Sequence, residues 1–502
     1  MLARLRAAAV FGIHAVPVSV EVDVSPGLPG MTMVGLPDTT VRESRDRVRT
    51  AIRNAGFPFP SDRVTVSLAP SDVRKIGAAF DLPIALGILA ASGALPHREE
   101  SRFTIVGGVS LDGTVPPMRG LLPIAVAARE TTGALVFPRA NVHEASVVNA
   151  LKLFPVGSLM EAARVLVSPQ PVPSPPVPPA AASDTPHAED LGEVRGQLVG
   201  RRALEVAAAG AHHLLFAGPP GAGKTMLARR LPGILPPLDP DEALTVTTIH
   251  SVAGQLPPGG GLLRHRPFRS PHHTCSDVAL VGGGSTPRPG ELSLAHGGVL
   301  FLDELPEFSR RVLETLRQPL EHGLVHIARA NHSVTFPANV MLVGAMNPCP
   351  CGFLGSPHRP CRCPAVAVER YQRRLSGPLR DRFDLWLEIP ALPWADMWAP
   401  RSPESSAVVR ERVIAARARQ QARQGCTNAR LDGRKLQRVC ELDGPEADRL
   451  LGRGVERFGL SARAVTRVLR VARTLADLGH EPVVRKEHVA EALQLRGPDL
   501  GV

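Results

Sequence analysis

The sequence contains few aromatic residues and few lysines. Aromatic residues make up only 4% of the 502 residues, with 15 Phe, 3 Trp and 1 Tyr, so a surface that stacks nucleic-acid bases on aromatic rings is not expected. Lysines account for only five of the 58 Lys and Arg residues. A lysine inside a functional motif therefore stands out, because this chain uses arginine almost everywhere else.

Long apolar runs are also missing. The longest run, residues 82–95, is shorter than the roughly 18 residues that a membrane span requires, and it contains Gly87 and Ser92. The seven cysteines are odd in number, and four of them lie within residues 349–363, which disfavours a secreted, disulfide-linked fold. The sequence therefore predicts a cytoplasmic protein without a membrane partner.

The chain is long enough for about three domains. Prolines at nearly every second position in residues 168–186 predict an extended linker. Short β-branched runs alternate with Ala-rich helical stretches before the linker, and Arg-rich helical patterns run from about residue 400 to the end. Between them, fully apolar strands separated by helical segments indicate a parallel sheet covered on both faces. These strands are predicted at 212–218, 299–304, 339–347 and 385–390.

One segment fits the phosphate-binding pattern G-x-x-x-x-G-K-[ST] in full. It reads GPPGAGKT, and it lies between an apolar strand and a helical segment, as the motif requires. We expect its backbone N–H groups to close around the phosphates of ATP, with a charge supplied by Lys224 and an Mg²⁺ ligand by Thr225. The predicted nucleotide-binding residues here are Gly218, Pro219, Pro220, Gly221, Ala222, Gly223, Lys224 and Thr225.

Polar residues end the next two apolar strands. The first strand ends at Asp303 and Glu304, and the second ends at Asn347. We expect Asp303 to bind the nucleotide's Mg²⁺ together with Thr225 and Glu304 to orient and polarise the attacking water. Asn347 is placed to bridge this water and the γ-phosphate. The sequence thus predicts an ATP hydrolase that uses Mg²⁺.

Several segments resemble the magnesium-chelatase-like ATPases of the AAA+ class, in particular the bacterial YifB/ComM family. Besides GPPGAGKT and the FLDE strand end, the similarity includes NPCPCG and SGPLRDRFDLWLEIP. It extends over nearly the whole chain outside the Pro-rich linker. The segments that carry it are 28–60, 69–93, 218–225, 266–284, 290–308, 347–352 and 376–390.

The resemblance implies an α/β fold in four parts. A Lon-protease-like N-terminal domain is expected at residues 1–167, followed by the Pro-rich linker at 168–188. A P-loop AAA+ domain with a parallel sheet is expected at 189–398, and a C-terminal helical lid at 399–502.

The resemblance also implies a homo-hexameric ring that binds ATP between subunits. Arg382, in the segment DRFD, then falls at the position of an arginine finger that reaches the γ-phosphate of a neighbouring subunit. Arg463, in GLSARA, falls at the sensor-2 position on the lid. Both are therefore counted among the catalytic residues, although without the resemblance either one reads more readily as a solvated surface arginine.

The N-terminal domain lacks the residues of a protease. Lon proteases use a Ser nucleophile and a Lys base. Leu122 stands at the position of the lysine, and residues 77–81, where the serine belongs, contain none. A structural or substrate-handling role is therefore expected in place of proteolysis.

Four cysteines are arranged as two C-x-C pairs separated by nine residues, namely Cys349, Cys351, Cys361 and Cys363. Four thiolates at this spacing can reach one tetrahedral Zn²⁺, which would be structural because all its positions are filled. The alternative is a loop with four free thiols.

Positive charge suggests a nucleic-acid partner. The chain has a net charge of +11, and the residues after 400, with 20 basic and 13 acidic side chains, supply +7 of it. Such charge suits contact with DNA phosphates, but solvated charge is the alternative. We therefore expect ATP hydrolysis coupled to DNA translocation or remodelling, and the resemblance points to a helicase or branch-migration role in recombination or natural transformation. The alternative function is an ATP-driven remodeller, chelatase-subunit-like or chaperone-like, that acts on a partner protein.

Overall fold

The computed structural model describes residues 1–35, 39–71, 75, 77–95, 102–173, 189–257, 259–284, 287–329, 332–356, 359–397 and 404–497. The chain divides into two compact units. The first unit contains Met1–Ser183 and Pro240–Leu263, and the second contains Asp184–Asp239 and Arg264–Val502. Most of the predicted linker, residues 174–188, lies outside the described residues. The predicted boundaries between the N-terminal, AAA+ and lid domains stay a prediction.

The first unit is built on a seven-stranded mixed sheet. Its strand order is β3-β4-β2-β1-β5-β6-β7, in which β2 pairs antiparallel with β1 and β4 and the remaining neighbours are parallel. The alternation of valines at 18, 20 and 22 predicts a strand, and all three side chains are buried. The strands are β1 (Leu2–Phe11), β2 (His14–Ser25), β3 (Gly30–Val34), β4 (Arg63–Ala69), β5 (Thr104–Ile105), β6 (Ala134–Pro138) and β7 (Lys152–Val156).

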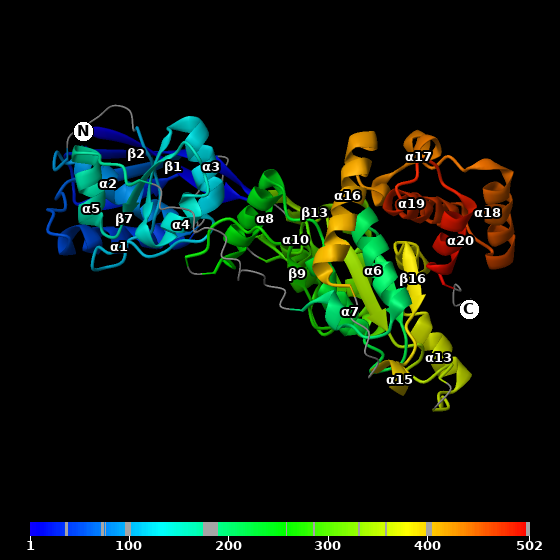
Figure 1. The fold of residues 1–502 in the computed structure, drawn as a ribbon. Helices are drawn as coiled ribbons and strands as arrows, with labels where there is room; N and C mark the ends of the chain where they lie inside the picture. Colours follow the sequence, from blue (N-terminus) through cyan, green and yellow to red (C-terminus); the bar gives the residue numbers. More distant parts are fainter. Residues whose placement is uncertain are drawn as a thin grey trace. The chain divides into compact units, whose positions relative to one another are not determined.

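Helices cover both faces of this sheet (Figure 1). Alternate residues of one strand point to opposite sides, so Ala7 of β1 joins one hydrophobic core and Ala8 joins the other. The helices α1 (Thr39–Asn54), α2 (Asp81–Ala91) and α5 (Leu159–Val167) pack in the first core. The helices α3 (Leu121–Thr131) and α4 (Val142–Ala145) pack in the second, and α8 (Pro240–Ala253) packs against α3.

The second unit contains a five-stranded, fully parallel sheet in the order β16-β8-β15-β12-β9. Every residue of β8, β12 and β15 is buried, as expected for strands that are covered on both faces. The carboxyl ends of parallel strands share one edge, so the segments that follow β8, β12 and β15 meet there. The strands are β8 (Leu214–Ala217), β9 (Phe268–Arg269), β12 (Val299–Leu302), β15 (Met341–Met346) and β16 (Leu385–Glu388).

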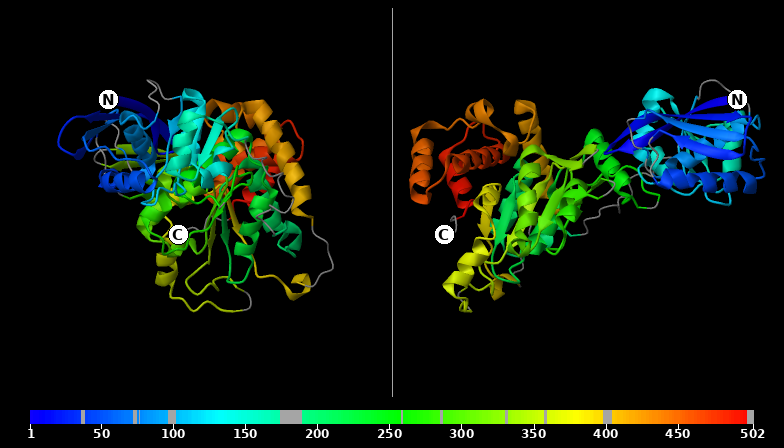
Figure 2. Two further views of the ribbon diagram at one scale, coloured as in Figure 1. Left: turned by 90° about the vertical axis from the view of Figure 1, so that its left-hand side faces the viewer. Right: turned by 180° about the vertical axis from the view of Figure 1, so that it is seen from behind.

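Helices complete the second unit. The helices α6 (Leu198–Gly210), α7 (Lys224–Ile234) and α16 (Ser406–Gln424) pack on one another and on the sheet. The C-terminal helices, orange to red in Figures 1 and 2, pack together within the part of the chain that the sequence predicts to be a lid. They are α17 (Gly433–Val439), α18 (Gly444–Phe458), α19 (Ala462–Leu478) and α20 (Lys486–Gln494). The mixed α/β fold class predicted from the sequence is thereby confirmed.

Shorter elements connect these parts. A hairpin of β13 (Leu324–Arg329) and β14 (His332–Pro337) follows the helices α11 (Arg310–Thr315) and α12 (Arg317–His322). No helix among the described residues is both long and apolar enough to cross a membrane. The remaining elements are α9 (Asp277–Val281), β10 (Gly282–Gly283), β11 (Arg288–Pro289), α10 (Glu291–Leu294), α13 (Ala365–Gln372), α14 (Gly377–Arg380) and α15 (Trp394–Met397).

Candidate functional site

The phosphate-binding loop connects β8 to the N-terminus of α7. The Lys224 ammonium donates hydrogen bonds to the carbonyl oxygens of Gly218 at 2.7 Å and Pro219 at 2.9 Å, and to Oδ1 of Asn347 at 3.1 Å. Burial lowers the pKa of Lys224, while the negative charges of Asp303 and Glu304 act in the opposite direction. Lys224, the only lysine in the sequence between residues 153 and 434, is thus a partly desolvated cation at the carboxyl ends of the parallel strands.

A second contact joins the loop to β12. The Thr225 hydroxyl donates to Oδ2 of Asp303 at 2.7 Å, and the backbone N–H of Glu304 donates to Oδ1 of the same carboxylate at 2.9 Å. Oxygen ligands in adjacent positions of an octahedral Mg²⁺ site lie about 2.9 Å apart. The Thr225 and Asp303 oxygens therefore fit the requirements of that ion.

Two glycines of the loop are required by its geometry. Gly223 has a φ of 91°, in the left-handed region that side chains other than glycine rarely adopt. At Gly218 an added Cβ would lie 2.2 Å from the carbonyl oxygen of Ile389. The glycines at both ends of the motif therefore let the loop turn back on itself and pack against the end of β16.

Glu304 has a backbone conformation that is unusual for its residue type. It adopts a φ of 51°, which ends β12 at Leu302, two residues before the predicted end of the strand. Its side chain is 55% exposed, and Oε2 lies 3.2 Å from Nδ1 of His273. Left-handed conformations at non-glycine residues cost about 1 to 2 kcal/mol and cluster at functional sites.

His273 was not predicted from the sequence as a site residue. The only signal for it was the pair His272–His273 in a segment that follows β9, the neighbour of β12. The two imidazole rings lie 4.1 Å apart, but His272 bonds to Thr274 and only His273 contacts Glu304.

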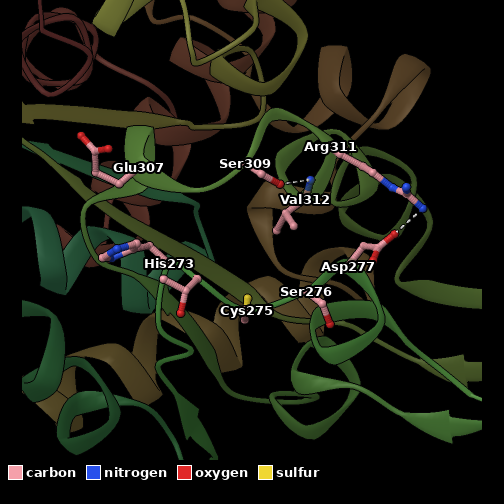
Figure 3. Close-up of a pocket in the computed structure, with 9 residues that line it drawn as sticks. His273, Cys275, Ser276, Asp277, Glu307, Ser309, Arg311 and Val312 are labelled. Atoms are coloured by element: carbon pink, nitrogen blue, oxygen red, sulfur yellow. Dashed lines mark hydrogen bonds and ion pairs between the residues drawn. The ribbon is translucent and has the colours of Figure 1, made fainter.

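A pocket of about 410 Å³ adjoins His273 (Figure 3). The segment 273–277 lines one side of it, and the segment 307–312 lines the other. An ion pair of 2.7 Å between Arg311 and Asp277 bridges the two segments, as Figure 3 shows. The pocket therefore has an ion pair at its rim and is lined by His273, the residue that contacts Glu304.

A larger cleft of about 1040 Å³ lies next to the phosphate-binding loop. Gln197 lines it and donates hydrogen bonds to the carbonyl oxygens of Ala222 at 3.1 Å and Pro390 at 2.8 Å. Residues of α6 such as Arg201, of the segment after β16 such as Ile389, and of α16 such as Arg412 complete the lining. The volume of this cleft is at the upper end of the range for small-molecule binding pockets, which is about 300 to 1,000 Å³.

The two predicted catalytic arginines lie apart from these contacts. Arg382 donates through Nη2 to Oε2 of Glu321 at 2.6 Å, and its side chain is 22% exposed. Arg463 is exposed in the first turn of α19. Within the described residues of this one chain, neither makes a hydrogen bond or ion pair with the phosphate-binding loop.

A buried polar cluster connects the segment after Arg382 with the lid. The Asp384 carboxylate lies 3.3 Å from Nη1 of Arg467 and 3.4 Å from Nδ1 of His212, and it accepts the backbone N–H of His213 at 3.1 Å. Burial lowers the pKa of His213 to about 4. Despite its own burial, the pKa of Asp384 lies well below the usual value because of the hydrogen bond and charge of His212 and the charge of Arg467.

The four clustered cysteines lie within reach of one metal ion. All four Sγ atoms fall within 4.8 Å of one another, and the sulfur of Cys349 lies 3.4 Å from that of Cys351 and 3.6 Å from that of Cys361. Sulfurs bound to one tetrahedral Zn²⁺ at about 2.3 Å are about 3.8 Å apart, whereas disulfide sulfurs are about 2.0 Å apart. The arrangement thus fits the metal, and all seven cysteines of the chain are free.

Several arginines of the basic region after residue 400 and of the segment before β12 make internal contacts. Arg412 pairs with Glu205 and Glu404 at 2.6 and 2.7 Å, and Arg423 pairs with Asp477 at 2.6 Å. In the segment before β12, Arg269 binds Glu291 through two nitrogens at 2.6 and 2.7 Å. Except for Glu404, which is eight residues from Arg412, the acidic partners lie at least 22 residues away in the sequence, so a count of local charge does not reveal them.

Exposed basic residues remain on α17. Arg434, Lys435 and Arg438 are exposed, and none of them has a hydrogen-bond or ion-pair partner among the described residues.

In the first unit, Leu122 is fully buried in the core beneath α3. Its backbone N–H donates at 3.0 Å to the buried carboxylate of Glu144, which also accepts from the Ser251 hydroxyl of α8. The position expected for a protease lysine is therefore part of an apolar core.

Three family descriptions match consecutive parts of the chain. Residues 190–397 match "Magnesium chelatase, subunit ChlI", residues 20–141 match "Subunit ChlI of Mg-chelatase", and residues 403–496 match "Magnesium chelatase, subunit ChlI C-terminal".

Full-length relatives agree with these matches. The chain is 44% identical to YifB of Escherichia coli over 498 residues, which cover 98% of this chain and 96% of the relative. It is 44% identical to the competence protein ComM of Haemophilus influenzae over 499 residues, which cover 99% and 97%. A 67 kDa magnesium-chelatase subunit of Heliobacterium mobile is 29% identical over 193 residues, or 33% of this chain and 29% of the relative. The chain belongs to the YifB/ComM family of magnesium-chelatase-like AAA+ proteins.

Proposed function

We propose that this chain hydrolyses ATP at the site where β8, β12 and β15 end. The observation that carries the proposal is the pair of contacts between Lys224 and Asn347 and between Thr225 and Asp303. These contacts join a phosphate-binding loop, a carboxylate and an amide from three separate strands. Their residue types are those that phosphoryl transfer from ATP requires.

Each residue has a distinct role in this proposal. Lys224, which gives up water on burial, gains a favourable charge partner when phosphate oxygens replace its contacts with Gly218 and Pro219. The Thr225 and Asp303 oxygens hold Mg²⁺, which when bound neutralises charge on the β- and γ-phosphates. Glu304 accepts a proton from the attacking water, and Asn347 orients that water against the γ-phosphate. The cleft beside Gln197 takes the base and ribose.

The proposal includes a homo-hexameric ring. Arg382 then acts on the ATP of a neighbouring subunit, which accounts for its distance from the loop of its own chain. Arg463 acts from the lid. A positive charge in the first turn of a helix interacts unfavourably with the helix dipole and lowers stability by about 0.3 to 1 kcal/mol. Arg463 stands in the first turn of α19, so its position there favours a functional role over a stabilising one.

Two substitutions test the ATP site. Lys224→Ala should lose ATP binding, because the charge that faces the phosphates is removed. Glu304→Gln should retain binding but lower turnover by about 100-fold or more, because only the proton acceptor is lost. Equal ATP affinity for the wild type and Lys224→Ala in a direct binding assay would refute the assignment.

We further propose that ATP hydrolysis drives DNA translocation or remodelling, with a helicase or branch-migration role in recombination or natural transformation. The name of the Haemophilus relative, a competence protein, supports this pathway. The net charge of +11 and the three exposed basic residues of α17 support a DNA partner. A cytoplasmic location suits both the DNA and the free thiols.

Salt-titrated DNA binding tests this coupling. The slope of log K against log salt should fall by about 0.9 for each phosphate contact that is removed, so Arg434→Ala/Lys435→Ala/Arg438→Ala should reduce it by about 2.7. ATP turnover should rise with DNA in the wild type. If DNA has no effect at any salt concentration and a protein partner raises turnover instead, the chain is an ATP-driven protein remodeller.

We also propose that Cys349, Cys351, Cys361 and Cys363 hold a structural Zn²⁺. The distances between their sulfurs support this proposal. Elemental analysis of protein purified without chelator should find about one Zn per chain, and a fully folded, metal-free sample would eliminate the site.

A further inference from the structure

The four cysteines lie in a loop that connects the end of β15 to the start of α13. We call residues 348–364, of which 357 and 358 lie outside the described residues, the cysteine loop. Its first residue follows Asn347 directly, and Cys363 comes two residues before α13 begins at Ala365. Any constraint that the sulfurs place on this loop therefore acts next to the residue that contacts Lys224.

The cysteine loop packs against the phosphate-binding loop. At Gly352 an added Cβ would lie 2.5 Å from Cδ and 2.7 Å from Cγ of Pro220, and 3.8 Å from Cγ of Asn347. Pro220 is the third residue of the phosphate-binding motif, and its ring cannot rotate away as a flexible side chain would. The two loops are thus in close contact at one point.

The helix that follows the cysteine loop, α13, returns to the same place at its C-terminal end. Nε2 of Gln372, the last residue of α13, donates to the carbonyl oxygen of Pro348 at 3.1 Å. The hydroxyl oxygen of Tyr371 accepts a hydrogen bond from the Asn347 backbone, and burial raises the pKa of Tyr371 to about 12. The start of the cysteine loop and the end of α13 are therefore fixed around Asn347, with the four cysteines in the chain between them.

We propose that the metal held by the four cysteines positions the ATP site through the Gly352–Pro220 contact. The inference rests on the ATPase and zinc assignments above. A tetrahedral ion closes the cysteine loop, the closed loop presses Gly352 against Pro220, and this contact fixes the phosphate-binding loop relative to Asn347. Loss of the metal releases the loop, so that Lys224 and Asn347 are no longer held at hydrogen-bond distance. The metal site thereby makes ATP turnover depend on zinc and on reduced cysteines, although no cysteine touches the nucleotide.

Two glycines of the cysteine loop provide a matched pair of variants. Gly352 and Gly355 have φ angles of 82° and 77°, so alanine imposes a similar backbone strain at both. Only at Gly352 does a Cβ meet Pro220, because at Gly355 nothing lies within 4 Å. Gly352→Ala should keep one Zn per chain but lower ATP turnover at least tenfold. Gly355→Ala should keep both the zinc and turnover within about twofold of the wild type.

Hydrogen exchange of the full-length chain gives a readout that does not depend on ATPase activity. Removing zinc from the wild type with a chelator should speed exchange in the peptide that covers residues 218–225, and re-addition of Zn²⁺ should reverse it. Gly352→Ala should speed the same exchange with its zinc retained.

Unchanged exchange at residues 218–225 in both cases would overturn the inference even if the wild type hydrolyses ATP. Equal turnover of the two glycine variants would overturn it as well. A wild type that exchanges as expected but does not hydrolyse ATP would refute the proposed function and leave the link between the two loops standing.

Discussion

Nδ1 of His273 lies 3.2 Å from Oε2 of Glu304, so the carboxylate expected to accept the proton of water is engaged by an imidazole from another segment. The contact comes from the residues that follow β9, which pairs with β12. A carboxylate held in this way has a partner other than the attacking water.

Replacement of His273 should release Glu304. We expect His273→Ala to raise ATP turnover in the absence of DNA severalfold and to reduce its further stimulation by DNA. His272→Ala is the matched control, because His272 bonds to Thr274 and makes no contact with Glu304 among the described residues. Steady-state rates with and without DNA provide the measurement. Equal turnover of His273→Ala and His272→Ala, with and without DNA, would show that the contact between His273 and Glu304 does not control ATP hydrolysis.

The stability of the second unit should fall between pH 6.5 and pH 4 because of His213. Its Nδ1 accepts the backbone N–H of Leu342 at 3.0 Å, which requires a neutral ring, and burial lowers its pKa from 6.5 to about 4. The unfolded chain therefore binds this proton first as the pH falls. A pKa difference of 1 between the folded and unfolded chains changes the free energy of unfolding by about 1.4 kcal/mol. The loss should reach about 3 kcal/mol near pH 4.

Trp386 and Trp394 belong to the second unit, and the third tryptophan, at 398, lies outside the described residues but within the sequence range of that unit, so tryptophan fluorescence during denaturation reports on the second unit. His213→Asn keeps an acceptor near Leu342 but does not titrate, so its stability should vary less between pH 7 and pH 4.5. The exposed His322→Asn should follow the wild type. Parallel pH profiles for all three proteins would contradict the role assigned to His213.

The core of the candidate site could be predicted from the sequence because each part is local. GPPGAGKT specifies its own loop, and apolar runs that end in Asp303 and Asn347 indicate strands of one parallel sheet. Parallel strands end at a common edge, which is why these residues meet Thr225 and Lys224. The roles of Glu304, Arg382 and Arg463 stay predictions, since they depend on bound ATP and on a second subunit.

Features that depend on long-range packing could not be predicted. The helix α8 follows α7 in sequence, yet it packs in the first unit, where Ser251 bonds to Glu144. Arg412 and Arg423 belong to the basic region after residue 400, for which the sequence left DNA contact and solvated charge as alternatives, but they pair with acids 207 and 54 residues away. Charge and periodicity along the chain carry no information about such partners.

Asp477 should be essential for the lid. It is 1% exposed, and it pairs with both Arg423 and Arg473 and accepts from Nδ2 of Asn428 at 2.8 Å. Asp477→Asn leaves two arginines without a counter-charge, one of them fully buried, so we expect a loss of about 3 to 5 kcal/mol. Hydrogen exchange of the α19 peptide should rise accordingly. The exposed Asp448→Asn on α18 should leave that exchange unchanged, and an equal response of both variants would contradict the prediction.

Arg382 and Lys224 should complement each other between subunits. In the proposed ring, Arg382→Ala leaves its own nucleotide pocket intact but removes the arginine offered to a neighbour, whereas Lys224→Ala does the reverse. Each variant alone should be inactive. In a mixed ring, some interfaces pair an intact Lys224 pocket with an intact Arg382, and only those interfaces should hydrolyse ATP. Activity should therefore return in proportion to their fraction, with a maximum near equal mixing.

The same mixing experiment separates Arg382 from its neighbour Arg380. Nε and Nη2 of Arg380 are buried without a hydrogen-bond partner among the described residues, and its guanidinium lies 5.5 Å from the ring of Trp386. Both side chains are partly exposed, and Nε of Arg382 is also buried without a hydrogen-bond partner among the described residues, but Nη2 of Arg382 pairs with Glu321, a contact that a subunit interface can replace. If subunit exchange is confirmed and Lys224→Ala regains no activity with Arg382→Ala, then Arg382 does not act across the interface. Arg380→Ala mixed in the same way would then identify the residue that does.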